Sequence, residues 1–399
     1  MFEDVQLGPQ DPMFNLKKLA DNDSSPKKID LGVGIYRNEK GKYHELQAIN
    51  KYELTTGNPS FLKNAASVIF GKDCEALRAG RITSVQTISG TGACHLAALF
   101  LTRCATFEHK QRVVYLGTPA WGNYEPLCQL VGFEVVKYRY YNAEKSKVDF
   151  DTLLNTVSMA PANSVFIVQG CCHNPTGVDL TQVQWRSLTE AMKKAQVFPF
   201  FDIAYQGLGS SMEDDSFGIR LFTQMGFEMV VCQSFSKNFG LYGERCGVLH
   251  VVTHDATTSN NVYDQLRCLI RWEFSSSPAY GSRLVNIIIE NSYLEELWLS
   301  ELSTMRHRLL ENRHKLYQRL MNVYKTPGNW EALQTTTGLF CLLPLSGEQI
   351  TELRDRHHIY IPDNGRINIA GLNPDNLNLV ASAIDEVVKK TSRQVGTHN

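Results

Sequence analysis

The sequence predicts an α/β protein with a large domain built on a mainly parallel sheet and a second, smaller α+β domain. A chain of 399 residues exceeds one ordinary domain. From about residue 90 to residue 247, short apolar runs alternate with helix-like stretches, and after about residue 297 this alternation gives way to a long helical pattern. Strands separated by helices favour a parallel sheet that carries helices on both faces.

Five short apolar runs in the first part of the chain are predicted to be strands. They are Arg112–Leu116, Val165–Gln169, Val197–Asp202, Met229–Ser234 and Gly247–Val252. Between them lie helical patterns such as Thr181–Gln196, in which Trp185, Leu188 and Met192 share one face. In a sheet of this kind, ligands bind beyond the carboxyl ends of the strands.

The second part of the chain predicts a different arrangement. A long helix is expected over Leu302–Val323, followed by short strands at Gly338–Leu345 and Arg366–Ala370 and by a final helix from about Pro374. We therefore predict a large domain over residues 44–305. The small domain is predicted to combine residues 306–399 with the N-terminal segment 1–43.

Composition narrows the classes of function. Lys plus Arg (40) nearly balance Asp plus Glu (41), so no overall field favours nucleic acid or an anionic membrane, and no apolar run is long enough to cross a bilayer. The ten cysteines show no CxxC spacing, which predicts buried free thiols of a reducing compartment and no metal site. The N-terminal residues resemble no targeting peptide, so we expect a cytoplasmic protein; a mature mitochondrial form would look the same.

Two charged residues follow predicted strands directly. Lys237 lies in Ser-Phe-Ser-Lys-Asn after the strand Met229–Ser234, where a desolvated lysine could form a Schiff base; the alternative is a solvated loop lysine. Asp202 ends an apolar strand, and a buried carboxylate needs a cationic partner or strong donors. The alternative for Asp202 is a helix cap or turn.

Three further groups of polar residues are compatible with a ligand at the same edge. Ser89, Gly90 and Thr91 precede an apolar helix predicted over His95–Cys104, so they form either a phosphate site or a plain helix cap. Asn174, in Asn-Pro-Thr-Gly, either forms a turn or hydrogen-bonds an oxygen on the ring of a bound ligand. Tyr205 either offers its phenol to the same ligand oxygen or packs in the core.

Taken together, the stretches HNPTG, FDIAYQG and QSFSKNFGLYGER resemble the aspartate aminotransferase family of fold-type I pyridoxal-phosphate enzymes, and they occur in that family's order. The resemblance covers about residues 28 to 389. It implies a seven-stranded sheet, pyridoxal 5'-phosphate as cofactor, and ping-pong transfer of an amino group between L-aspartate and 2-oxoglutarate. It also implies small amino-acid and 2-oxo-acid substrates and a homodimer with shared active sites.

The resemblance assigns a role to each matching residue. Lys237 would be the Schiff-base lysine and proton shuttle, Asp202 the partner of the pyridinium nitrogen, and Asn174 and Tyr205 the partners of the ring oxygen. Trp121 would stack on the ring, and both Trp121 and Asn174 would contact the substrate. The residues that would hold the phosphate are Ser89, Gly90, Thr91, Ser234 and Arg245, with Tyr52 reaching across the dimer.

The substrate contacts implied by the resemblance come from three places. Arg366 would bind the α-carboxylate beside the backbone of Gly34, and Arg271 of the other subunit would bind the side-chain carboxylate. Arginine matches a planar carboxylate bidentately, which suits a dicarboxylic substrate. Without the motifs, surface ion pairs would explain the arginines, and packing would explain Trp121.

Three departures from the family pattern qualify these implications. The segment between Gly41 and Tyr52 is shorter than in relatives, Tyr124 replaces a histidine that would support Asp202, and residues 275–278 read Ser-Ser-Ser-Pro in place of Ser-Asn-Pro-Pro. Two other functions therefore stay open. One is a broader aminotransferase for aromatic or kynurenine-type amino acids, and the other is a catalytically weakened paralogue that binds the cofactor.

Overall fold

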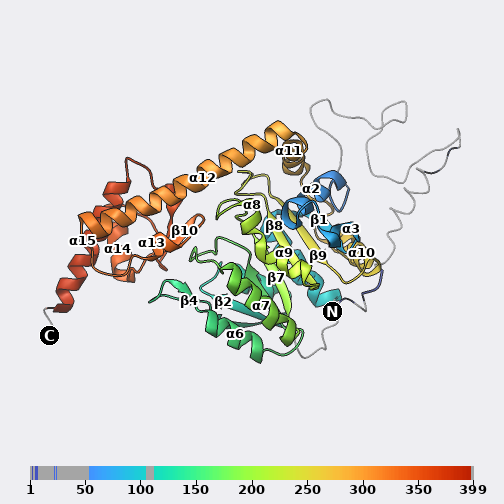
Figure 1. Ribbon diagram of the computed structural model, residues 1–399, viewed down its shortest axis with the longest axis horizontal. Coiled ribbons are helices and arrows are strands. Elements are labelled where there is room, and N and C mark those ends of the chain that lie inside the picture. The colour runs from blue at the N-terminus through green and yellow to red at the C-terminus, as the bar shows by residue number, and fades with distance from the viewer. Residues whose placement is uncertain are drawn as a thin grey trace.

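The structure is a computed structural model that describes residues 54–104 and 112–396, with a few isolated positions before residue 25. Its centre is a seven-stranded sheet in the order β1-β9-β8-β7-β6-β2-β3 (Figure 1). The strands are β1 Ile82–Ile88, β2 Val113–Thr118, β3 Glu134–Arg139, β6 Val165–Gln169, β7 Phe198–Ile203, β8 Met229–Ser234 and β9 Cys246–Val252. Only β9 among these is antiparallel to its neighbours, which confirms the predicted mainly parallel sheet.

Helices cover both faces of the sheet, as the alternating pattern predicts. They are α2 Pro59–Phe70, α3 Glu75–Arg78, α4 Ser89–Cys104, α5 Tyr124–Leu130, α6 Phe150–Met159, α7 Gln182–Ala195, α8 Met212–Asp215, α9 Phe217–Gln224, α10 Ala256–Glu273 and α11 Ala279–Glu290. Strand β7 shows the consequence for the core. Phe200 packs in the apolar cluster with α4 and α10, and the next residue, Phe201, packs in the cluster with α6, α7 and α9. Successive side chains of a strand point to opposite faces, so one apolar run serves both layers.

The second unit lies at the far end of a long helix, α12 Ser292–Gln318, which continues as a π-helical turn over Arg319–Val323 (Figure 1). Leu302 of α12 packs in the core of the large unit, and Leu309 and Leu316 pack in a separate cluster with Trp330 and Leu353. The remaining elements of this unit are α13 Ala332–Thr335, β10 Phe340–Leu342, α14 Gly347–His357, β11 Arg366–Asn368 and α15 Leu377–Gly396. The predicted inclusion of residues 1–43 lies almost wholly outside the described residues.

The second unit meets the loop that follows β6 through the Asp179 carboxylate, and the buried Arg313 holds the segment that makes this contact. Arg313 of α12 is 2% exposed and donates hydrogen bonds to backbone carbonyls, those of Thr337, Gly338 and Phe340. The Asp179 carboxylate accepts from the Thr337 hydroxyl (2.8 Å) and from two backbone N–H groups of the loop, those of Cys172 and His173. The segment that precedes β10 is thus fixed to the loop that carries Asn174.

Several predicted elements differ from the observed ones in extent. The long helix begins at Ser292, where Asn291 caps it, and not at Leu302. Helix α4 begins at Ser89, so the small residues expected before the helix form its first turn. The strands near the C-terminus are shorter than predicted. Strands β1 and β3 were missed, as was a small hairpin of β4 Tyr141–Asn142 and β5 Lys147–Val148.

Candidate active site

A cavity of about 150 Å³ lies where β6, β7 and β8 end. The parallel register places Gln169 beside Asp202 and Asp202 beside Cys232, so neighbouring strands deliver their last side chains to one place. Ten predicted site residues line the cavity: Ser89, Gly90, Thr91, Trp121, Asn174, Asp202, Tyr205, Ser234, Lys237 and Arg245. These residues therefore meet at the carboxyl ends of the strands, where the rule for parallel sheets places a ligand.

One end of the cavity is suited to a phosphate. Helix α4 begins there, and the free N–H groups and positive dipole end of a helix favour an anion. Gly90 is required by close packing, because a Cβ at this position would lie 2.7 Å from the Cβ of Ser234. The Arg245 guanidinium donates to Ser89 Oγ at 2.6 Å, which adds a cation to the same end.

The other end of the cavity holds the Asp202 carboxylate. Its Oδ2 accepts a hydrogen bond from the Tyr124 phenol at 2.5 Å. Burial raises the pKa of Asp202 to about 6, against the lowering effects of the Tyr124 hydrogen bond and the Lys237 charge. A carboxylate that is costly to ionise in this way is stabilised by a cation placed next to it.

Lys237 lies between these two ends, on the loop after β8, and is half-buried. Its ammonium nitrogen is 5.0 Å from the centre of the Tyr205 ring. Burial lowers the pKa of Lys237, the nearby Asp202 raises it, and Arg245 lowers it. Burial raises the pKa of Tyr205, and the neighbouring Asn174 side chain lowers it slightly. A lysine whose charged form is destabilised is closer to the neutral amine that a nucleophile or base requires.

Arg366 approaches the cavity from the second unit. It is the first residue of β11, and its Nη1 donates to Asn174 Oδ1 at 2.9 Å. The guanidinium lies over the Phe340 ring, 4.2 Å from the ring centre. An arginine held by a ring face and by one amide oxygen keeps further N–H donors for a carboxylate.

Besides Arg366, which approaches the cavity without lining it, three predicted residues do not line this cavity or cannot be placed. Arg271 is exposed in the last turn of α10, where its Nη1 donates to Ser275 Oγ at 2.6 Å. This location is compatible with action on another subunit's site. Gly34 and Tyr52, and the shortened segment between Gly41 and Tyr52, lie outside the described residues.

Five lining residues were not among the predicted site residues: Tyr124, Gln169, Ala204, Ser236 and Tyr242. Gln169 holds the backbone of Asn174 at both ends, since its Oε1 accepts from the Asn174 N–H (2.8 Å) and its Nε2 donates to the Asn174 carbonyl (3.0 Å). It is the last residue of a predicted strand, so the carboxyl-end rule would have found it. The sequence predicts that Tyr124 removes the support of an imidazole, whereas the structure shows that its phenol supplies a hydrogen bond to Asp202.

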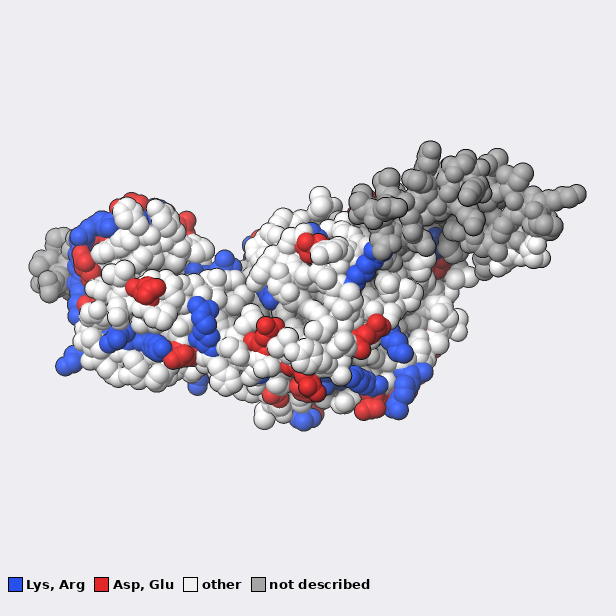
Figure 2. All heavy atoms as spheres, turned by 90° about the horizontal axis from the view of Figure 1, so that it is seen from above, with Lys and Arg blue, Asp and Glu red and all other residues white. Residues whose placement is uncertain are grey.

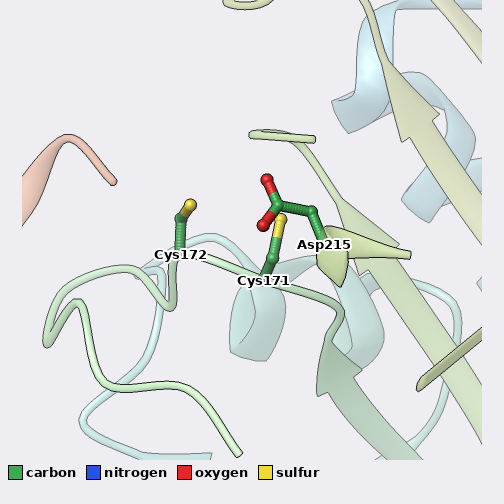
Figure 3. Close-up of side chains that lie close together, drawn as sticks. All are labelled: Cys171, Cys172 and Asp215. Carbon is green, nitrogen blue, oxygen red and sulfur yellow. The ribbon is translucent and has the colours of Figure 1, made fainter. Parts of the chain in front are cut away.

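Cys171 and Cys172, in the loop that follows β6, lie close to the Asp215 carboxylate (Figure 3). The Asp215 carboxylate accepts three backbone N–H groups, those of Gly207, Gly209 and Ser210. The Cys172 sulfur is packed so closely that a Cβ on Gly338 would lie 2.7 Å from it. This cluster is therefore a buried clamp for the loop after β7. All ten cysteines are free; eight are buried as predicted, whereas Cys74 and Cys104 are half-buried.

The surface and the helices add two observations. On the face shown in Figure 2, lysine and arginine are interspersed with aspartate and glutamate. Among the described residues, no helix is both long and apolar enough to cross a membrane. That face therefore carries no large basic surface among the residues shown in colour.

Comparison with known proteins assigns this fold and site to a family. The family model for aminotransferase class I and II matches residues 26–384, so the chain belongs to this family. It is 43% identical to aminotransferase tasG of Hapsidospora irregularis, over 97% of this chain and 96% of that protein. It is 38% identical to the mitochondrial aspartate aminotransferase of Dictyostelium discoideum, over 96% of this chain and 92% of that protein.

A solved structure is similar over nearly the whole chain. It is an aromatic-amino-acid aminotransferase from Burkholderia pseudomallei, covalently bound to pyridoxal phosphate, with a TM-score of 0.82 and 35% identity over 97% of this chain and 99% of that one. The family and this neighbour confirm the predicted fold class and the predicted cofactor. The residues present fit that cofactor: an anion cradle that a Cβ at Gly90 would obstruct, a buried carboxylate for a ring cation, and a partly desolvated lysine between them.

Proposed function

We propose that this chain is an aspartate aminotransferase, which exchanges an amino group between L-aspartate and 2-oxoglutarate by a ping-pong mechanism. The observation that carries the proposal is the convergence of Asp202, Lys237 and the Ser89 turn in one cavity, with Arg366 hydrogen-bonded to the cavity residue Asn174. When bound, pyridoxal phosphate supplies an electron sink that stabilises negative charge on the substrate Cα.

The proposal gives each residue of the chain a physical task. Ser89, Thr91 and Arg245 hold the phosphate, Asp202 keeps the ring nitrogen protonated, and Trp121 covers the ring. Asn174 and Tyr205 donate to the ring oxygen. Lys237 Nζ takes the proton from the substrate Cα and returns it to the adjacent position, because burial lowers its pKa and so favours the neutral amine that can accept a proton.

Selection of the substrate rests on two arginines. Arg366 grips the α-carboxylate that all amino acids share. Arg271 binds the side-chain carboxylate in the site of a second subunit, so a homodimer is part of the proposal. Two residues outside the described part also belong to it: Gly34, beside the α-carboxylate, and Tyr52, which reaches the phosphate across the dimer. Fixing both ends of a dicarboxylate orients the Cα–H bond toward the lysine.

A broader aminotransferase is the second candidate, because the relatives are mixed. The 43% identical tasG is named only as an aminotransferase, and the solved Burkholderia pseudomallei neighbour acts on aromatic amino acids. Relatives from two compartments also match, since the mitochondrial and the cytoplasmic aspartate aminotransferases of Dictyostelium discoideum are both similar. Cytoplasmic location is part of the proposal and is supported by the ten free thiols.

The two candidates are separated by kcat/KM for aspartate and for phenylalanine in three proteins. In Arg271→Leu, kcat/KM for aspartate should fall by about 10³- to 10⁴-fold while phenylalanine is spared, because the side-chain carboxylate of aspartate would enter the site without a cationic partner. Arg366→Leu is the matched control and should harm both substrates alike. An unchanged ratio in Arg271→Leu would move the assignment to the broader aminotransferase. Wild-type protein that binds pyridoxal phosphate but turns over neither substrate would indicate the weakened paralogue.

A further inference from the structure

The Asp202 carboxylate is supported by a side chain that the proposed chemistry has not used. Tyr124 begins α5, is 1% exposed, and donates its phenol hydrogen to Asp202 Oδ2 at 2.5 Å. The Trp121 ring stands edge-on to the Tyr124 ring, at 5.1 Å and 88°. Both rings line the cavity. The phenol is thus locked between a packed ring and the carboxylate.

The other groups around Asp202 do not duplicate this contact. Lys237 acts on the carboxylate through its charge, from the loop after β8. The thiols of Cys94 on α4 and Cys232 on β8 lie nearby, as does the Tyr205 phenol after β7. The contact with Cys232 and burial raise the pKa of Cys94, and burial raises the pKa of Cys232 and of Tyr205. These three groups are therefore neutral near pH 7. Within the described part of the chain, Tyr124 supplies the side-chain hydrogen bond that fixes the carboxylate.

A carboxylate has two oxygen atoms, and the Tyr124 phenol takes only one of them. The second oxygen of Asp202 is left for a cation inside the cavity, and the phenol sets the direction in which this oxygen points. A hydrogen bond to a charged acceptor also favours the ionised form of Asp202, as the lowering effect of Tyr124 on its pKa shows.

We propose that Tyr124 is a positioning residue, which orients the Asp202 carboxylate toward the ring nitrogen of the cofactor through a neutral donor. The proposal rests on the proposed aminotransferase function. A phenol differs from an imidazole in one testable respect. Burial raises the pKa of Tyr124 well above its ordinary value, so the phenol remains a donor at every pH at which the enzyme works. An imidazole at this place would change its charge near pH 6.5.

The test measures the binding of pyridoxal phosphate to the apoenzyme between pH 5.5 and 8.5, by equilibrium dialysis and by the near-visible absorbance of the bound cofactor. Tyr124→Phe should weaken binding by about 10- to 100-fold, the effect of losing a hydrogen bond to a charged acceptor. Tyr124→His should recover part of this affinity and should bind more weakly as pH rises through about 6.5. Tyr140→Phe is the matched control, because it also removes a buried phenol hydrogen bond, to the Val178 carbonyl, and Tyr140 does not line the cavity.

Inorganic phosphate distinguishes positioning from general damage. It binds the α4 end alone, so its inhibition constant against cofactor binding should be the same in Tyr124→Phe and in wild type. A Tyr124→Phe protein that binds the cofactor as wild type does, or that loses affinity for phosphate and cofactor equally, would overturn the proposal. So would a Tyr140→Phe protein that is weakened as much. Wild-type protein without a near-visible band would overturn the proposed function itself.

Discussion

Replacing Asp202 by asparagine is expected to stabilise the apoprotein at neutral pH while it abolishes productive cofactor binding. Burial raises the pKa of Asp202 to about 6 in the folded chain, against an ordinary value of 3.8. Between these values the unfolded chain has released this proton and the folded chain has not. The free energy of unfolding contributed by Asp202 is therefore greatest below about pH 4, decreases as pH rises toward 6, and stays at its lower level above pH 6.

The magnitude follows from the two pKa values. They differ by about two pH units, and each unit corresponds to about 1.36 kcal/mol, so ionised Asp202 costs the empty protein about 3 kcal/mol at pH 7. Asparagine keeps the acceptor for the Tyr124 phenol but carries no charge. The variant should thus be more stable than wild type by up to about 3 kcal/mol at pH 7.5, and the difference should shrink toward pH 4.

Urea unfolding of the two apoproteins at several pH values measures this difference. The other buried carboxylates, Asp179 and Asp215, are present in both proteins, so their contributions cancel. Adding pyridoxal phosphate should reverse the order, because only wild type offers a negative partner to the ring nitrogen. Equal unfolding free energies with equal pH dependence in the two apoproteins would refute the reasoning, and would show that the carboxylate is not strained by burial.

Two further predictions concern the lysine and the docking of the second unit. Lys237→Ala should lose turnover by several orders of magnitude yet retain the cofactor through the phosphate, as the absorbance spectrum of the dialysed protein would show. Mixing this variant with Arg271→Ala protein should restore part of the activity. No restoration in a proven dimer would contradict the shared site. Arg313→Met should lower the free energy of unfolding by about 2–5 kcal/mol, because it leaves buried carbonyls without donors. It should also raise KM for all substrates through the displaced Phe340 under Arg366; a urea midpoint and KM values like those of wild type would argue against this link.

The interior of the sheet was predictable from sequence because its strands are apolar throughout. All six residues of β7 are buried, and its run of apolar residues stands out from the surrounding pattern. Strands β1 and β3 were missed because they form the two edges of the sheet and mix polar with apolar residues, as in Glu134–Arg139. An edge strand is half-exposed, so its composition resembles that of a loop.

The site was predictable to the extent that it follows from strand ends and motifs. Asp202 lies near the carboxyl end of an apolar strand and Lys237 follows another by three residues, and the structure brings them together as the parallel topology requires. Tyr124 was harder, because its hydrogen bond to Asp202 joins residues that are far apart in the chain and depends on the rotation of α5. The action of Arg271 depends on a second chain, so no pattern within one chain fixes its geometry.

The division of the site between the sheet and the far end of α12 has a consequence for turnover. Asp202 and Ser234 sit on β7 and β8, whose amides are held on both sides by neighbouring strands, so these positions open only when the whole sheet does. Arg366 belongs to a unit with its own apolar core, which touches the loop after β6 through a few hydrogen bonds. A displacement of that unit would therefore move Arg366, and with it the loop of Asn174, while Asp202 and Ser234 stay in the sheet. In such an enzyme the arginine that would bind the substrate can change position while the residues of the sheet that would hold the cofactor remain fixed.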